Sequence, residues 1–361
     1  MTETDLYEAV ASLIDRGVED SGDREQLARQ LLTRQFKKFP AWGRLQRARQ
    51  IKSVRPGLHA IRPFPVQLYK SLPAVAQQGD CIFETSGTSN QTPGRVVYSP
   101  RDLYLMQLAI DRSAAVHLFA DGNRSTQMVI LAPSPAERPS MIMAHGMQRL
   151  GTRFCTRADF YVQAGAMDLA GVLSTMAAAC AEGRPLTLAG GSFAFVGLAD
   201  HLIATNRTLT LPAGSRILDA GGTKGRSRDV TRSEFRTLME RAFGVPANWQ
   251  VNLLGMTELG SQFYDHVIGQ PRQGAGQGKH NDPWTQTWVV DPISLEPLPE
   301  GATGLLVHLD LANFDHPACI LTEDLGYATP DGFEIEGRAR GADLRGCALV
   351  MEEFKQQQAQ L

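Results

Sequence analysis

Thr85-Ser86-Gly87-Thr88-Ser89-Asn90-Gln91-Thr92-Pro93-Gly94-Arg95-Val96 is a hydroxyl- and glycine-rich loop that separates two apolar runs. Five of its first eight residues carry side-chain hydroxyls. Gly87 and Gly94 permit backbone angles and close approaches that a Cβ would obstruct. Backbone N–H groups, hydroxyls and the Arg95 guanidinium could together hold an anion through charge-assisted hydrogen bonds. The composition therefore predicts a loop that holds the phosphates of a nucleotide, and a surface turn is the alternative.

The spacing of this loop differs from that of the P-loop in kinases and GTPases. Six residues rather than four separate Gly87 from Gly94, and Val96 rather than Ser or Thr follows Arg95. The loop instead resembles the phosphate loop of adenylate-forming enzymes, the superfamily of acyl-CoA synthetases and firefly luciferase. Their pattern is Thr/Ser-Ser-Gly-Thr/Ser-Thr/Ser-Gly-x-Pro-Lys; here Arg95 stands at the lysine position and the loop is a residue or two longer. The resemblance implies a nucleotide-binding role for Thr85, Ser86, Gly87, Thr88, Ser89 and Arg95.

A second motif, Gly255-Met256-Thr257-Glu258, follows a strand-like run at 251–254. It resembles the Tyr-Gly-x-Thr-Glu motif of the same superfamily, with Leu254 in place of the tyrosine. The resemblance implies that Thr257 contacts the α-phosphate and that Glu258 is a catalytic residue that helps to bind Mg²⁺. A carboxylate suits this metal because Mg²⁺ prefers hard oxygen ligands. The alternative is an ordinary helix N-terminus capped by Thr257.

A glycine pair follows the strand-like Ile217-Leu218 in the run Asp219-Ala220-Gly221-Gly222-Thr223-Lys224-Gly225. It resembles the pair on which the adenine ring lies in these enzymes, and this implies nucleotide binding by Gly221, Gly222 and Thr223. Lys224 is a candidate catalytic cation, because an ammonium near the reacting carboxylate could neutralise charge that develops during adenylation. A glycine-rich turn and a solvated lysine are the alternatives.

Two further matches lie towards the C-terminus. Thr322-Glu323-Asp324-Leu325-Gly326 resembles the Thr-Gly-Asp motif, whose aspartate binds the ribose hydroxyls, with Glu323 in place of the glycine. Gly337-Arg338 resembles the Gly-Arg pair near the hinge of the superfamily, and this implies that Arg338 reaches the ribose or phosphate; a solvated arginine is the alternative. Five partial matches in the order of the family predict an ATP- and Mg²⁺-dependent adenylate-forming ligase.

The last part of the chain resembles a narrower family. Only 23 residues follow Arg338, so we expect no standard lid domain with a catalytic lysine. The run from Gly337 to Cys347 resembles the C-terminus of the acyl-protein synthetases of bacterial luminescence operons. The run 63–70, Pro-Phe-Pro-Val-Gln-Leu-Tyr-Lys, resembles the Pro-x-x-Pro-x-x-x-Phe/Tyr-Lys stretch of that family.

Membership of that family would assign a nucleophile. There, ATP activates a fatty acid, the acyl group moves to the enzyme's own C-terminal cysteine, and a partner reductase then receives it. The resemblance implies that Cys347 is the catalytic thiol, which as thiolate would attack the mixed anhydride. The alternative is a small buried apolar side chain.

The substrate pocket is only weakly marked. His145 lies where these enzymes often have an aromatic residue or histidine, and Ser192 could line the pocket wall; packing and turns are the alternatives for both. The predicted partners are a small carboxylic acid and an acyl-accepting reductase or carrier protein. Two other functions stay open. One is an aromatic-acid adenylating enzyme related to phenazine-pathway proteins or aryl-CoA ligases, and the other is a degenerate nucleotide-binding protein without turnover.

Apolar strand-like runs alternate with helical stretches after residue 81, which predicts an α/β fold. By resemblance this is the N-terminal domain of an adenylate-forming enzyme, with mixed, mainly parallel sheets flanked by helices and a β-rich C-terminal subdomain. We expect three parts. They are a helical region at 1–75, an α/β nucleotide-binding core at 76–283, and a β-rich subdomain with a short tail at 284–361.

Composition narrows the classes of function. The 361 residues carry a net charge of −2, so no basic field is present to attract nucleic acid or an anionic membrane. No apolar run approaches the roughly 20 residues that span a bilayer. Five widely spaced cysteines without a C-x-x-C pair fit a reducing compartment and no structural zinc. We therefore expect a cytoplasmic protein that binds no nucleic acid and does not insert into membranes.

Overall fold

The computed structural model describes residues 1–18, 22–50, 57–85, 93–207, 209–222, 227–271, 278–339, 351–354 and 356–357. The chain forms two compact units. Unit 1 consists of Met1–Ala109, Met256–Ser261 and Gly278–Leu361, and unit 2 consists of Ile110–Gly255 and Gln262–Gln277. Each unit therefore combines segments that are distant in sequence, and the division at 75 and 283 stays a prediction.

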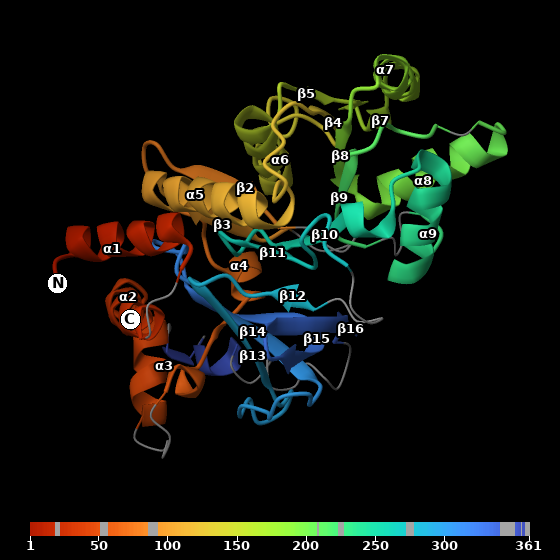
Figure 1. The fold of residues 1–361 in the computed structure, drawn as a ribbon. Coiled ribbons are helices and arrows are strands. Elements are labelled where there is room, and N and C mark those ends of the chain that lie inside the picture. The colour runs from red at the N-terminus through yellow and green to blue at the C-terminus, as the bar shows by residue number, and fades with distance from the viewer. Residues whose placement is uncertain are drawn as a thin grey trace. The chain divides into compact units, whose positions relative to one another are not determined.

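Unit 1 contains a largely antiparallel sheet, whose later strands are blue in Figure 1. Its strands lie in the order β12 (Lys279–His280), β16 (Gly332–Arg338), β15 (Cys319–Thr329), β14 (Gly304–Asp310) and β13 (Thr285–Val290). The short strand β1 (Phe64–Pro65) pairs with β15 in parallel. Strands β13 to β16 lie in the region 284–361, which was expected to be rich in β-structure. The sequence did not indicate β15, because Thr, Glu, Asp and Gly at its centre have mostly poor strand propensity.

The region 1–75, which was expected to be helical, contains α1 (Glu3–Arg16), α2 (Asp23–Lys38) and α3 (Pro40–Gln50). Thr2 and Asp5 form a capping box at the start of α1, and Gly17 ends the helix with a φ of 63°. The buried residues of α1 recur at helical spacing and are Leu6, Val10, Leu13 and Ile14. Short helices η1 (Leu58–Ala60) and α4 (Leu68–Ser71) follow.

A hairpin in unit 1 carries the predicted phosphate loop. Strands β2 (Cys81–Glu84) and β3 (Arg95–Tyr98) pair in antiparallel fashion with Glu84 opposite Arg95. The residues between them, 86–92, lie outside the described part of the chain. Helix α5 (Pro100–His117) begins directly after β3 and continues into unit 2.

Unit 2 contains a mixed, mainly parallel sheet, as predicted. The order is β11 (Gln262–Tyr264), β10 (Gln250–Gly255), β9 (Arg216–Ala220), β8 (Leu186–Gly191), β4 (Gln127–Leu131) and β5 (Arg157–Phe160). Only the pairing of β10 with β11 is antiparallel. The short strands β6 (Val162–Gln163) and β7 (Ala166–Met167) form a separate hairpin.

Helices cover the unit 2 sheet through a continuous apolar core. Residues of β4, β8 and β9 pack with α7 (Leu169–Glu182), α8 (Ser192–Ala204) and α9 (Arg232–Phe243). Helix α6 (Ile142–Phe154) approaches the sheet closely at Gly151, where a Cβ would lie 2.3 Å from the Cβ of Ala158. The short helix η2 (Ala247–Trp249) leads into β10. In such sheets ligands bind at the carboxyl ends of the strands, and Ser192 and Gly221 follow β8 and β9 at that edge.

Within the described residues, no helix has both the length and the apolar character that crossing a membrane requires.

Candidate active site

The base of the predicted phosphate loop is closed by two hydrogen bonds between Thr85 and Gly94. The Thr85 N–H donates to the Gly94 carbonyl at 2.9 Å, and the Gly94 N–H donates to the Thr85 hydroxyl at 2.9 Å. A Cβ on Gly94 would lie 3.1 Å from Thr85 Oγ1 and 3.2 Å from the carbonyl carbon of Tyr69. The absence of a side chain at Gly94 therefore lets the hairpin and helix α4 approach each other. Ser86, Gly87, Thr88 and Ser89 lie outside the described residues.

Arg95, at the lysine position of the family pattern, lies at the same end of the hairpin. Its guanidinium is 3.3 Å from Glu84 Oε1, and its side chain is 60% exposed. An ion pair this exposed contributes little to stability. Arg95 is therefore accessible to an anionic ligand, with the Glu84 carboxylate as its partner in the structure.

Thr257 and Glu258 occupy a tight turn, and the alternative of a helix N-terminus is wrong. Residues 256–261 contain no helix, and the Leu259 N–H donates to the Met256 carbonyl at 3.2 Å. The Thr257 hydroxyl donates to the carbonyl of Glu84 at 3.1 Å. This bond joins the second motif directly to the hairpin of the first.

Two buried side chains fix the backbone of this turn. The Tyr98 hydroxyl donates to the Thr257 carbonyl at 3.0 Å, and Asn313 Nδ2 donates to the Glu258 carbonyl at 2.8 Å. Asn313 Oδ1 also accepts from the Gly260 N–H at 2.8 Å. Both side chains are fully buried, so these hydrogen bonds do not compete with water. Sequence reasoning missed both positioning residues.

The Glu258 carboxyl group is buried and has no direct ion-pair partner among the described residues. The residue is 8% exposed and forms no ion pair among the described residues. The pKa of this group is raised from 4.5 to about 7, with burial as the largest cause and the Asp324 charge as a smaller one, while a backbone hydrogen bond and the positive charges of Arg338 and Lys70 oppose the shift. A buried carboxylate in need of positive charge fits a bound divalent cation. The described residues contain no group of three His, Cys, Asp or Glu side chains arranged for a metal, so Glu258 would be one protein ligand among phosphate and water oxygens.

The other two motifs of unit 1 meet on adjacent strands. Asp324 of β15 and Arg338 of β16 are paired in register, and Arg338 Nε lies 3.4 Å from Asp324 Oδ1. The Asp324 side chain is 13% exposed, whereas that of Arg338 is 53% exposed. Burial raises the pKa of Asp324 and the charge of Arg338 opposes this. The pair therefore presents a buried acceptor beside an accessible cation.

Two candidates of unit 2, Ser192 and Gly221, lie at a buried polar hub centred on Asp219. Its carboxylate accepts two hydrogen bonds from Arg232, at 2.7 and 2.8 Å, and one from Asn252 at 2.9 Å. The Ser192 hydroxyl is 2.6 Å from Asp219 Oδ2 and 2.9 Å from the Gly221 carbonyl. The hub therefore anchors the glycine turn that is predicted to lie against adenine. The pocket role of Ser192 stays a prediction.

The glycine turn itself has space around it. Gly221 has a φ of 74°, a conformation that favours glycine, and no atom of the described residues lies within 4 Å of a Cβ built on Gly221 or Gly222. A flat ring could lie against such a surface. Thr223 and Lys224 lie outside the described residues, as does Cys347.

His145 lies near the start of α6 in unit 2. The ring Nε2 is 2.9 Å from the Pro139 carbonyl. The next residue, Gly146, faces β11, because a Cβ there would lie 3.2 Å from the Gln262 side-chain amide. The role of His145 at the acyl pocket stays a prediction.

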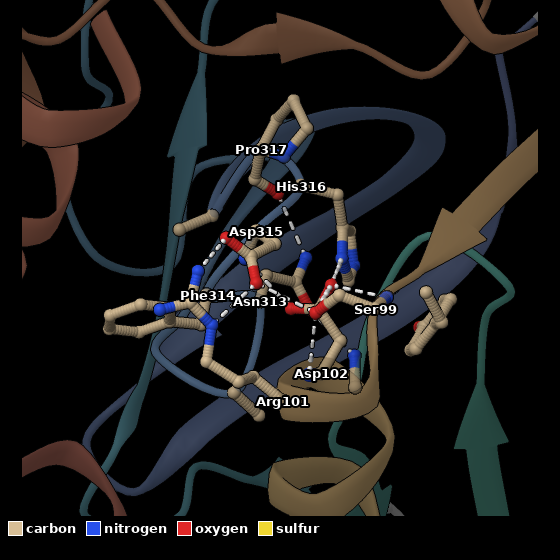
Figure 2. Close-up of polar contacts among 12 residues, drawn as sticks. Ser99, Arg101, Asp102, Asn313, Phe314, Asp315, His316 and Pro317 are labelled. Atoms are coloured by element: carbon tan, nitrogen blue, oxygen red, sulfur yellow. Dashed lines mark hydrogen bonds and ion pairs between the residues drawn. The ribbon is translucent and has the colours of Figure 1, made fainter. Parts of the chain in front are cut away.

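A network of charged residues supports the turn that carries Asn313, as Figure 2 shows. Asp315 accepts hydrogen bonds from Ser99 at 2.7 Å, from Arg101 at 2.9 and 3.0 Å, and from Arg34 at 2.6 Å. Burial alone would raise the pKa of Asp315, but these donors hold it well below its usual range. The run 313–317, polar between two buried strands, was the available sequence signal for this network.

A model of the acyl-protein synthetase family LuxE matches residues 49–355. The chain belongs to this family. The resemblance that the C-terminal segment indicated is thereby confirmed, and so is the predicted class of adenylate-forming ligase of the acyl-protein synthetase type.

Two curated relatives carry the name long-chain-fatty-acid–luciferin-component ligase. The protein from Vibrio harveyi is 23% identical over 310 residues, covering 82% of this chain and 78% of the relative. The protein from Aliivibrio fischeri is 28% identical over 181 residues, covering 46% of this chain and 45% of the relative.

Solved structures of adenylate-forming enzymes share the fold. A 2-hydroxyisobutyryl-CoA ligase has a TM-score of 0.61 at 15% identity, with 89% of this chain and 76% of that chain covered. A long-chain-fatty-acid-CoA ligase from Archaeoglobus fulgidus has a TM-score of 0.53 at 16% identity, covering 72% and 51%. ATP-bound MatB from Rhodopseudomonas palustris has a TM-score of 0.50 at 16% identity, covering 71% and 47%. The chain thus spans about half the length of the last two, and the predicted fold class is confirmed.

Proposed function

We propose that this chain uses ATP to activate a carboxylic acid, with a fatty acid favoured, as an acyl-adenylate, and then transfers the acyl group to a protein cysteine thiol. The observation that carries the proposal is the hydrogen bond from Thr257 to Glu84, which joins the turn of the second motif to the hairpin of the predicted phosphate loop. Membership of the LuxE family and the names of the curated relatives support the fatty acid.

The residues of unit 1 supply complementary binding chemistry for a nucleotide. Asp324 presents a carboxylate that can accept hydrogen bonds from two ribose hydroxyls. Arg95 and Arg338 present exposed guanidinium groups, which form paired hydrogen bonds with phosphate oxygens. Tyr98 holds the Thr257 backbone in place, and the Thr257 hydroxyl would exchange its hydrogen bond to the Glu84 carbonyl for one to the α-phosphate.

Glu258 is the candidate ligand for Mg²⁺. When bound there, the metal would neutralise phosphate charge during attack by the substrate carboxylate. Asn313 holds the Glu258 backbone, and burial excludes water from the carboxyl group. Lys224 is proposed as a second source of positive charge near the reacting carboxylate.

Transfer to a thiol completes the proposed reaction. The Cys347 thiolate attacks the carbonyl carbon of the acyl-adenylate, a C–S bond forms, and the C–O bond to AMP breaks with the electron pair leaving on the phosphate. AMP is a good leaving group, and the thioester remains reactive towards a second thiol. The proposed recipient is an acyl-accepting reductase or a carrier protein.

The test separates the two half-reactions. ATP–pyrophosphate exchange is measured with a panel of fatty and aromatic acids, and the protein is then analysed by mass spectrometry after incubation with ATP and the best acid. We expect exchange with fatty acids and a hydroxylamine-labile acyl group in the wild type. The variant Cys347→Ser should retain exchange and lose the acyl group.

Other outcomes would favour the alternatives. Exchange only with aromatic acids would identify an aromatic-acid adenylating enzyme. ATP binding without exchange would identify a degenerate nucleotide-binding protein. Equal acyl labelling of the wild type and Cys347→Ser would exclude Cys347 as the acceptor.

A further inference from the structure

His316 belongs to the turn that carries Asn313, and its side chain packs against Tyr98 of β3. The residue is 4% exposed, and the centroid of its ring lies 4.5 Å from that of the Tyr98 ring. Tyr98 is fully buried, and its hydroxyl donates to the Thr257 carbonyl at 3.0 Å. The His316 ring therefore contacts the side chain that holds the second motif of the predicted nucleotide site.

Asp102, in the first turn of α5, is the charged neighbour of the His316 ring. Its carboxylate Oδ2 lies 3.3 Å from His316 Nδ1, as Figure 2 shows. The Asp102 side chain is fully buried and is itself held in place, because it accepts hydrogen bonds from the Ser99 N–H at 3.0 Å and from the Asp315 N–H at 2.8 Å. A carboxylate held in this way provides a fixed contact for the imidazole.

The backbone at His316 is held by helix α2. Gln35 Nε2 donates to the His316 carbonyl at 2.7 Å, and Gln35 Oε1 accepts from the Ala318 N–H at 2.9 Å. Gln35 is fully buried, so water does not compete for these bonds. Neither ring nitrogen of His316 forms a hydrogen bond among the described residues. The place of the ring is therefore set by the backbone anchor, by Asp102 and by packing against Tyr98.

We propose that His316 is a positioning residue for nucleotide binding: its ring holds the Tyr98 ring in place, and Tyr98 in turn holds the Thr257 backbone. The inference rests on the proposed ATP-dependent function, in which Thr257 contacts the α-phosphate, and adds a residue to it. The Tyr98 ring is held by its contacts with His316 and with Phe83, whose ring centroid lies 5.2 Å away. Removal of the His316 ring would leave a cavity beside Tyr98. The Tyr98 ring would then shift, and its hydrogen bond to Thr257 would weaken.

The test is a double-mutant cycle on ligands that differ only in the α-phosphate. Dissociation constants for AMP and adenosine are measured by isothermal titration calorimetry, with Mg²⁺ present. The variants are His316→Gln, which removes the ring, Tyr98→Phe, which removes only the hydroxyl, and the two together. His316→Phe keeps a ring beside Tyr98. His308→Gln, at a fully buried histidine of the same unit whose ring lies 4.9 Å from that of Phe333, is the matched control. Urea unfolding verifies that each variant is folded at the assay temperature.

We expect His316→Gln to weaken AMP binding about 3- to 10-fold, the scale of one hydrogen bond, and to change adenosine binding less than about 2-fold. His316→Phe should stay within about 2-fold of the wild type for both ligands. In the Tyr98→Phe background, His316→Gln should change AMP binding less than about 2-fold, because the hydroxyl through which it acts is absent. His308→Gln should lower the free energy of unfolding and leave both dissociation constants unchanged.

Several results would overturn the inference. They are unchanged AMP binding in folded His316→Gln, equal weakening of AMP and adenosine, weakened AMP binding in folded His316→Phe, and an equal effect of His316→Gln with and without the Tyr98 hydroxyl. A matching loss of AMP affinity in His308→Gln would also overturn it, because reduced stability alone would then explain the effect. A wild type that binds neither ATP nor AMP would instead refute the proposed function, so the two failures are distinguishable.

Discussion

Replacing Glu258 by glutamine should stabilise the protein at alkaline pH while it removes activity. The buried carboxyl group has a folded-state pKa of about 7 against 4.5 in the unfolded chain. Its ionised form is therefore disfavoured by folding, and stability falls as the pH rises from 4.5 to 7. Each pKa unit corresponds to about 1.4 kcal/mol. The ionised carboxylate thus costs about 3 kcal/mol above pH 7, and a neutral glutamine of the same shape avoids this cost.

The assay is urea unfolding of the wild type and Glu258→Gln at pH 5 and pH 8, followed by tryptophan fluorescence. Other titrating groups are common to both proteins, so the difference between them isolates residue 258. We expect Glu258→Gln to be more stable by about 3 kcal/mol at pH 8 and by less than about 1 kcal/mol at pH 5. Glu300→Gln, at an exposed turn residue, should change stability by less than about 0.5 kcal/mol at either pH.

The same variant should lose ATP–pyrophosphate exchange, since the neutral amide is a poor ligand for Mg²⁺. A gain in stability together with a loss of exchange would show that Glu258 lowers the stability of the fold and is required for activity. Equal stability differences at pH 5 and pH 8, or a loss of stability at pH 8, would refute the reasoning, because either result means that the carboxylate is compensated in the folded protein.

Three further predictions concern buried polar groups. Asp219→Asn should lower the free energy of unfolding by about 3–5 kcal/mol, because Arg232 loses its charged partner. Urea unfolding measures this free energy. A change below about 1 kcal/mol would contradict the stabilising role given to the Asp219 hub. Tyr98→Phe removes one hydrogen bond to the Thr257 carbonyl and should lower the free energy of unfolding by about 1–3 kcal/mol. It should also raise the KM for ATP in the exchange assay. An unchanged KM would mean that Tyr98 does not position Thr257 for the nucleotide. Asp315→Asn should lower the free energy of unfolding at pH 7. The loss should be smaller below pH 3.8, because the folded-state pKa of Asp315 is lowered and the stabilisation by its carboxylate disappears as the pH falls. Thermal unfolding as a function of pH measures this, and an equal loss at every pH would mean that packing alone is responsible.

The fold was predictable where short patterns carry the information. Strands β4, β8, β9 and β10 are apolar runs between turn residues, and that pattern indicates buried parallel strands without any knowledge of their partners. The motif with Thr257 and Glu258 directly follows one of these strands, and the roles predicted for both residues come from its resemblance to the superfamily motif. The hydrogen bond between Thr257 and Glu84 joins the first two motifs, and the site roles of their residues stay predictions.

The supporting residues could not be predicted, because their roles depend on pairings across long separations in sequence. The hydrogen bond from Asn313 to the Glu258 carbonyl and the one from Ser99 to Asp315 form only when β14 and β15 have paired in the folded chain. Strand β15 itself was missed, since polar residues at its centre weaken the local strand pattern. Local propensity contains no information about these contacts.

The pairing of β1 with β15 has a consequence for synthesis on the ribosome. Phe64 finds its partner Ile320 only after roughly 250 more residues have been made, which takes about 10–50 s at typical rates of translation. Unit 2 consists mainly of the continuous segment Ile110–Gly255. We therefore expect unit 2 to fold during synthesis, before the apolar faces of the N-terminal helices are covered by the later strands of unit 1. Those first helices are then the part of the nascent chain on which chaperones would act.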